Sequence, residues 1–210
     1  MPHVPRVSLF VLALLLGGIA TPPALAQSFP GGEEAAPLLA DFGAQIVLAG
    51  HQLIVGEGGV VTASGEGGRG AVGRHSGGGG GGSGGGLLLE ATRVSVRGAL
   101  TANGGGGGQG RRGDGEAESG AKGSFVSADP ALGGAGESSG GVGGDGGARD
   151  VDAEHGAAGN SGSSAGPAGG GGGGGGVGRI RIGGCEPPEL DGDASISPAA
   201  SGAGEAALDC

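Results

Sequence analysis

The chain has 210 residues, of which 61 are glycine, and its formal net charge is −10 at pH 7. Glycine brings no side chain for catalysis, packing or recognition, so this composition argues against an enzyme. The acidic balance argues against a nucleic-acid-binding protein. With no Trp, no Tyr and only four Phe, the chain also lacks the aromatic burial of an ordinary core.

Residues 1–26 have the pattern of a secretory signal peptide. A basic start with Arg6 precedes an apolar stretch over 7–20, and Ala-Leu-Ala at 24–26 supplies the small residues of a cleavage site. A membrane anchor is the alternative, but the stretch is short for a span. We expect cleavage before Gln27 and a secreted protein, extracellular or at the cell surface, with the periplasm as an alternative compartment. No later segment is apolar enough to cross a membrane.

After a lead-in over 27–42, residues 43–108 contain the same pattern twice. Each copy has an apolar triplet, an apolar-x-apolar strand, a glycine turn and a short strand that ends in Thr-Ala-Ser-Gly or Thr-Ala-Asn-Gly. A partial third copy follows within residues 169–198. The copies equate Leu53 with Val94, Val55 with Val96, and Val61 with Leu100; the third copy consists of Arg-Ile-Arg-Ile at 179–182 and Ser-Ile-Ser at 195–197.

Short, β-branched strands broken by glycine corners are typical of a stacked β-coil. We predict a mainly β chain that forms a short right-handed parallel β-solenoid of about three rungs, with an antiparallel meander or sandwich as the alternative. Stacking joins the few aliphatic residues of each rung into one narrow core. The residues expected inside are Leu53, Val55, Val61, Val94, Val96, Leu100, Ile180 and Ile182; those expected outside are Arg93, Ser95, Arg97, Arg179 and Arg181.

Long glycine runs adjoin these strands, at 77–86, 104–108 and 169–176. One interpretation is polyglycine II, in which extended helices pair their N–H and C=O groups laterally because no Cβ keeps them apart. The other is a flexible or disordered linker. The sequence leaves both open.

Residues 109–168 mix glycine with small and acidic residues and contain few apolar ones. We expect a mobile surface insertion. Gly-Gly-Val-Gly-Gly-Asp at 140–145 matches the opening of a calcium-binding nonapeptide, without a tandem copy. Oxygen ligands could hold Ca²⁺ weakly, whereas a solvated acidic loop is the simpler interpretation. The candidate ligands are Asp145, Asp150, Asp152 and Glu154, and no other metal or cofactor site is expected.

The two cysteines are Cys185 and Cys210, the latter in a tail over 199–210. A secreted chain meets an oxidising compartment, which favours a disulfide between them. Two free thiols, or an intermolecular bridge through Cys210, are the alternatives.

The remaining motifs have simple explanations. His51, His75 and His155 lack a nucleophile signature or ligand spacing around them, so surface positions are expected. Arg-Gly-Asp at 112–114 is attributed to chance in a chain of this composition. A solenoid enzyme such as a polysaccharide lyase is the least expected function, because the strand faces lack paired carboxylates and aromatic sugar platforms.

Three segments together resemble the glycine-rich secreted or cell-surface proteins of GC-rich bacteria, which are similar to the mycobacterial polymorphic glycine-rich repeat family. They are residues 77–91, 100–104 and 169–182; the PE-type helical leader of that family is absent. The resemblance implies surface exposure and a structural or adhesive role, without catalytic residues to transfer.

The expected function is therefore a secreted, non-enzymatic structural or surface protein, adhesive or matrix-forming, that contacts extracellular matrix or cell-surface components. A calcium- or glycan-binding adhesin module and a disordered extracellular spacer are the alternatives. Neither nucleic acid nor a membrane span after signal cleavage is expected.

Overall fold

The computed structural model describes residues 38–39, 45–113, 115–160 and 166–202. Within these ranges the chain forms strands and extended segments without a helix, so the expected mainly β class is confirmed there. The described residues therefore contain no helix that could cross a bilayer. The predicted signal peptide and Cys210 lie outside the described residues. The strands are β1 (Leu38–Leu39), β2 (Gln45–Val55), β3 (Val60–Thr62), β4 (Gly86–Val96), β5 (Ala99–Thr101), β6 (Arg179–Gly184), β7 (Glu189–Leu190), β8 (Ser195–Ser197) and β9 (Ala200–Ser201).

The strands form two sheets in which every pairing between strands is parallel. One sheet has the order β2-β4-β6-β9, with β7 also paired to β4, and the other has the order β1-β3-β5-β8. The strands that the sequence copies share therefore pair with their counterparts one copy further along: β2 with β4, β4 with β6, β3 with β5, and β5 with β8. This excludes the antiparallel meander for the described strands.

The register is the one that the sequence copies predict. Leu53 pairs with Val94 and Val55 with Val96. The third copy joins the same sheets, because Ile180 is in register with Leu87 and β8 pairs with β5. Parallel stacking in this register places like residues above one another, so aliphatic side chains form continuous columns.

A narrow aliphatic core fills the space between the sheets. All the residues expected inside are buried, with Val61, at 7% exposed, the least so. The core also contains Leu87 and Leu89, which come from the apolar triplet of the second copy. The arginines expected outside are exposed: Arg93, Arg97, Arg179 and Arg181.

Ser95 differs from the prediction of an outward, exposed side chain. Only 8% of it is accessible. In the sheet, Ser95 is in register with Ile54 on β2 on one side and with Glu189 on β7 on the other. The extra strand β7, which no repeat pattern announced, therefore covers this position.

Buried hydroxyl groups mark the end of the second sheet. Thr62, Thr101 and Ser197 are in register, and Thr101 Oγ1 donates to Thr62 Oγ1 at 2.7 Å. Thr62 Oγ1 in turn donates to Ser64 Oγ at 3.0 Å. These contacts satisfy the polar groups at the point where the chain leaves the sheet.

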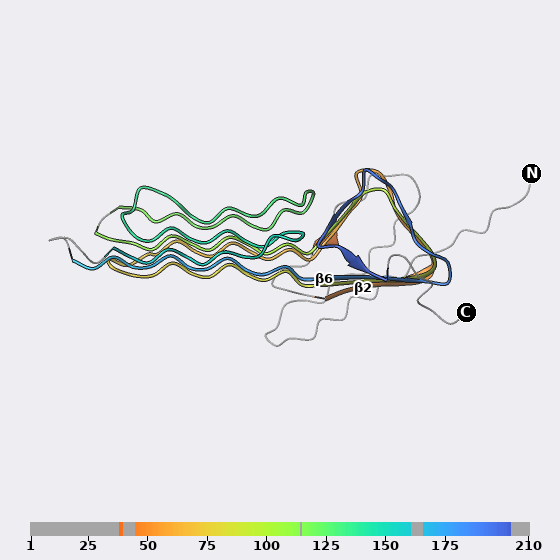
Figure 1. Cartoon of the computed structure of the whole chain (residues 1–210), viewed down its shortest axis with the longest axis horizontal. Helices are drawn as coiled ribbons and strands as arrows, with labels where there is room; N and C mark the ends of the chain where they lie inside the picture. The colour runs from red at the N-terminus through yellow and green to blue at the C-terminus, as the bar shows by residue number, and fades with distance from the viewer. Residues whose placement is uncertain (1–37, 40–44, 114, 161–165, 203–210) are drawn as a thin grey trace, which may run out of the picture.

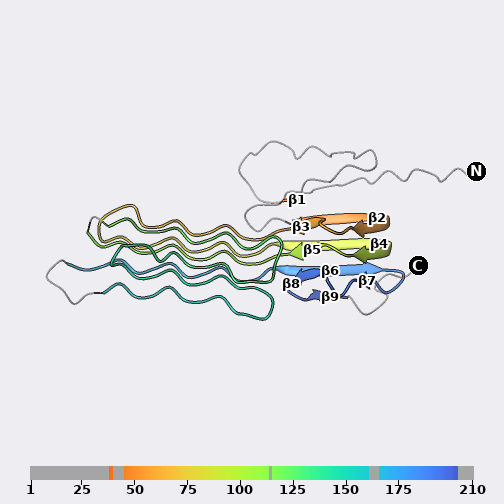
Figure 2. The ribbon, with the colours of Figure 1, turned by 90° about the horizontal axis from the view of Figure 1, so that it is seen from above.

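Two regions with different architecture result. Figure 1 looks down the direction in which the strands stack, so that successive turns of the chain overlie one another around a triangular outline, and Figure 2 shows the same turns side by side. The glycine-rich excursions leave one corner and run together in one direction. We call residues 45–62, 86–101 and 179–201 the strand stack, and residues 63–85, 102–160 and 166–178 the glycine bundle.

Candidate functional site

Backbone hydrogen bonds that recur every third residue hold the glycine bundle together. In its central segment, residues 104–111, every third N–H donates to the same neighbouring segment. The pairs are Gly104 to Gly147, Gly107 to Gly144 and Gly110 to Gly141, each at 2.8 Å. The N–H groups between them donate in the same rhythm to residues 76–82 and 118–121.

The carbonyl groups of the central segment accept from three further segments. Gly175 and Gly172 donate to Gly105 and Gly108, and residues 65–71 donate in the same three-residue rhythm. Gly134 donates to Gly107 at 2.8 Å. Three segments that accept and three that donate thus surround this one, and residues 102–110 are all buried. The main chain is satisfied here without a hydrophobic core.

Glycine is required inside this arrangement. A Cβ on Gly107 would lie 2.0 Å from the carbonyl oxygen of Gly172, and a Cβ on Gly108 would lie 2.1 Å from that of Arg69. No real side chain tolerates such distances, and the obstructing atoms are backbone. At the surface the constraint disappears, because a Cβ on Gly176 would meet nothing within 4 Å.

Two amide side chains interrupt the buried glycines. Asn103 Nδ2 donates to the carbonyl oxygens of Ser124 and Ser127 at 2.8 and 2.9 Å. Six residues later, Gln109 Nε2 donates to the carbonyl oxygens of Gly136 and Ser138 at 3.0 and 2.8 Å. Each amide therefore ties the central segment to an adjacent loop or segment.

The expected mobile insertion over 109–168 is arranged differently in its described part. Residues 118–121, 131–134 and 141–147 are extended and bonded to the central segment or to one another. The large apolar residues of the stretch remain outside, with Leu132 67% exposed. The sequence-based expectation rested on the small number of apolar side chains in the stretch and did not consider main-chain pairing, which its described part shows.

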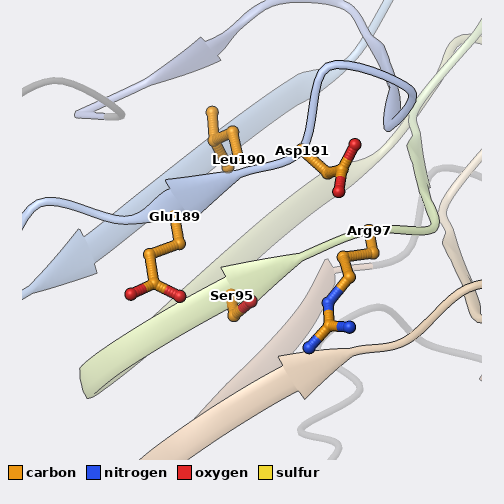
Figure 3. Close-up of a pocket in the computed structure, with 5 residues that line it drawn as sticks. All are labelled: Ser95, Arg97, Glu189, Leu190 and Asp191. Atoms are coloured by element: carbon orange, nitrogen blue, oxygen red, sulfur yellow. The ribbon is translucent and has the colours of Figure 1, made fainter.

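A shallow polar cleft of about 340 Å³ lies on the strand stack. Ser95 and Arg97 come from β4 and the turn after it, whereas Glu189, Leu190 and Asp191 come from β7 and the residue after it. Figure 3 shows Ser95 between the Glu189 and Arg97 side chains. The parallel pairing of β4 with β7 brings these residues together from positions far apart in the sequence.

The side chains of this cleft have few protein partners. Asp191 Oδ1 accepts from the N–H of Asp193 at 3.0 Å, which orders the turn after β7. Within the described part of the chain, neither Arg97 nor Glu189 forms an ion pair, and the Ser95 hydroxyl makes no hydrogen bond. The cleft therefore presents a guanidinium and two carboxylates to solvent, and the largely buried Ser95 hydroxyl lines it without a protein partner.

The calcium candidates are not gathered into a site. Asp145 Oδ1 accepts from the N–H of Gly133 at 2.7 Å, which gives this carboxylate a structural contact in the bundle. Asp150, Asp152 and Glu154 are exposed. Among the residues that the structure places, no three acidic, histidine or cysteine side chains come close enough to hold a metal ion.

The other singled-out residues lie apart from one another. Cys185 is disulfide-bonded, which excludes a free thiol there; its expected partner, Cys210, lies outside the described residues. His51, His75 and His155 are exposed, as expected. In the Arg-Gly-Asp tripeptide, the N–H of Arg112 donates to Ser138 Oγ at 3.2 Å, and Asp114 is outside the described residues.

Sequence reasoning missed the carboxylates of the cleft. The only local signal is Pro-Pro at 187–188 before Glu189 and Asp-Gly at 191–192 after Leu190, a strand of two residues bounded by turn formers. No repeat relates it to β4.

Comparison with known proteins returned no family model, no curated protein and no solved structure that matches this chain.

Proposed function

We propose that this chain is a secreted, non-enzymatic structural protein of the cell surface, in which the strand stack serves as the base of a rigid, projecting glycine bundle. One observation carries the proposal: the main-chain hydrogen bonds of residues 104–111 recur every third residue and extend to surrounding segments on all sides. That network gives the glycine bundle, whose buried centre has few large side chains, a defined shape. A disordered spacer would not form such a network of hydrogen bonds.

Two finer assignments belong to this proposal. The strand stack is a short right-handed parallel β-solenoid, since parallel crossover connections adopt that hand almost without exception. The glycine bundle is a polyglycine II assembly. Its three-residue rhythm equals the three residues per turn of that helix, and glycine occupies the positions at which a Cβ would collide with backbone.

The shape suggests how the molecule would work. At about 3.1 Å per residue, an extended run such as 166–178 reaches about 37 Å. The bundle would hold its outer loops at that distance from the strand stack and present them to extracellular matrix or cell-surface components. Its loops carry exposed residues such as Val72, which is 84% exposed.

The test is made on the source cells. An epitope tag inserted after Val72 should be labelled by antibody on intact cells. A strain without the protein should lose adhesion or matrix integrity, and the phenotype should be restored by the Gly176→Ala variant but not by Gly107→Ala. Labelling only after lysis, or restoration by both variants alike, would contradict the proposal. Turnover of a polymer by the purified chain would contradict its non-enzymatic part.

A second candidate function is a glycan-binding adhesin, which the polar cleft beside β7 favours. The calcium-binding form has no comparable support, because the candidate ligands do not converge. An isotherm with Ca²⁺ for the full chain that showed saturable binding would restore it.

A further inference from the structure

The cleft differs from its surroundings in leaving its charges unpaired. Just before it along β4, Arg93 Nη2 pairs with Glu186 Oε2 at 2.9 Å. Arg97 lies four residues further along, and both Glu189 and Asp191 line the same cleft. Yet no ion pair joins Arg97 to either carboxylate among the described contacts. The same two segments therefore pair their charges in one place and leave them accessible in the next.

The charge of the lining favours a cationic ligand. Two carboxylates and one guanidinium give the cleft a formal charge of −2 + 1 = −1. The whole chain is also acidic, at −10, so its field attracts cations toward the site. An ammonium group between Glu189 and Asp191 would gain charge-assisted hydrogen bonds with both.

The remaining groups are suited to sugar hydroxyls. The Ser95 hydroxyl is free to donate and accept, and Arg97 provides several N–H donors. Neighbouring strands lie about 4.8 Å apart, and residues two apart along a strand about 6.7 Å, so the backbone positions of Ser95, Glu189 and Asp191 are spaced for one ring-sized ligand.

We propose that this cleft binds a cationic amino sugar, such as a glucosamine unit of a deacetylated polysaccharide. Glu189 and Asp191 hold the ammonium group, and Ser95 and Arg97 bind the ring hydroxyls. A basic peptide would contact the carboxylates alone and leave the Ser95 hydroxyl and the Arg97 guanidinium without partners. The proposal gives a ligand to the glycan-binding candidate and does not depend on the structural role of the glycine bundle.

The experiment is a titration of the full secreted chain with glucosamine tetramer, followed by calorimetry and by amide shifts of residues 95–97 and 189–191. The matched ligands are the fully N-acetylated tetramer and tetralysine. We expect saturable binding of the glucosamine tetramer. Both matched ligands should bind at least about tenfold more weakly, because the acetylated tetramer lacks the ammonium groups and tetralysine lacks the ring hydroxyls.

Substitutions test the assignment of groups. The double change Glu189→Gln and Asp191→Asn keeps the shapes and the oxygen that accepts from Asp193, and should weaken binding at least about tenfold. Ser95→Ala should weaken it a few-fold, with the amide spectrum elsewhere unchanged. Glu154→Gln, in the bundle, removes a charge away from the cleft and should have no effect.

Several outcomes would overturn the proposal. They are the absence of binding, equal binding of the acetylated tetramer, equal binding of tetralysine, and unchanged affinity in the double variant. If Glu154→Gln weakened binding as much as the double variant, binding would depend on the net charge of the chain and not on the cleft. That result would also overturn the proposal. None of these outcomes bears on surface exposure or on the bundle, so the structural proposal is judged separately.

Discussion

The strand stack and the glycine bundle reach order by opposite means. In the strand stack, columns of leucine, valine and isoleucine are almost completely buried, Leu89 and Leu100 at 0% exposure. In the bundle, the buried centre is glycine, and what it buries is hydrogen-bonded main chain. The comparison shows that burial of side chains and pairing of backbone are separable contributions, which one small protein uses in separate places.

The energetic balance differs accordingly. Fixing a residue costs about 1–2 kcal/mol of conformational entropy, with glycine at the upper end. A hydrogen bond returns about 0.5–1.5 kcal/mol net. The entropy cost and the hydrogen-bond gain nearly cancel, so the bundle by itself is only marginally stable. The chain enters the bundle after Thr62 and Thr101 and returns to the strand stack at Gly86 and Arg179. We infer that the bundle forms only on that base.

The largest effect should come from the core of the strand stack. Leu100→Ala removes a buried side chain and should lower the free energy of unfolding by about 2–5 kcal/mol. Because the bundle depends on the stack, hydrogen exchange should accelerate in both regions. Denaturant unfolding and amide exchange measure the two effects. Ile54→Ala, at a position 56% exposed, is the control. Intact protection in the bundle of the Leu100 variant would show that the bundle orders independently.

The next effect should be confined to the bundle. Gly107→Ala places a Cβ 2.0 Å from the carbonyl oxygen of Gly172, so segments must move apart, at a cost of about 3 kcal/mol. Exchange should accelerate at 104–111 and remain slow at Val94. Gly176→Ala, where the Cβ is unobstructed, should change stability by less than about 0.5 kcal/mol. Equal behaviour of the two variants would refute the close packing.

A smaller effect is expected where the two regions meet. Asn103→Ala leaves the carbonyl oxygen of Ser127 without this donor and that of Ser124 with only the Ser64 hydroxyl. It also removes the oxygen that accepts from the Ser197 hydroxyl. We expect a loss of about 2 kcal/mol in thermal or chemical unfolding. Asn160→Ala, at an exposed position, is the matched change and should be nearly silent. A silent Asn103→Ala would mean that water replaces these contacts.

The smallest effects should come from surface ion pairs, and they should be alike in both regions. Arg93 and Glu186 pair on the strand stack with about half of each side chain exposed, and Lys122 pairs with Glu66 on the bundle. Glu186→Gln and Lys122→Met should each change the free energy of unfolding by less than about 0.5 kcal/mol. A loss above 1 kcal/mol in either one, measured at low and high salt, would give that pair a structural role.

The strand stack could be predicted from the sequence because the pattern of its apolar side chains determines its fold. The alternation of apolar residues located Leu53, Val94 and Ile180 in the core, and matching copies set the register of the parallel strands. Ser95 escaped the prediction, since its burial depends on β7. A two-residue strand has no periodicity from which it could be recognised.

The glycine bundle and the cleft were less accessible to prediction. A glycine run is compatible with a linker and with an ordered helix, and the difference lies in whether neighbouring segments are present to accept its hydrogen bonds. Residues 109–168 lack a side-chain pattern because the bundle does not require one. The cleft depends on the pairing of β4 with β7, so Glu189 and Asp191 gained a role only once the fold was known.

The absence of apolar burial in the bundle also determines how it responds to temperature. Exposure of apolar surface raises the heat capacity on unfolding, whereas exposure of polar backbone lowers it. The columns of the strand stack therefore weaken on cooling, as hydrophobic contacts do, whereas the paired amides around Gly107 do not depend on apolar burial. In the cold, the strand stack therefore limits the stability of the whole molecule, including the glycine bundle that rests on it.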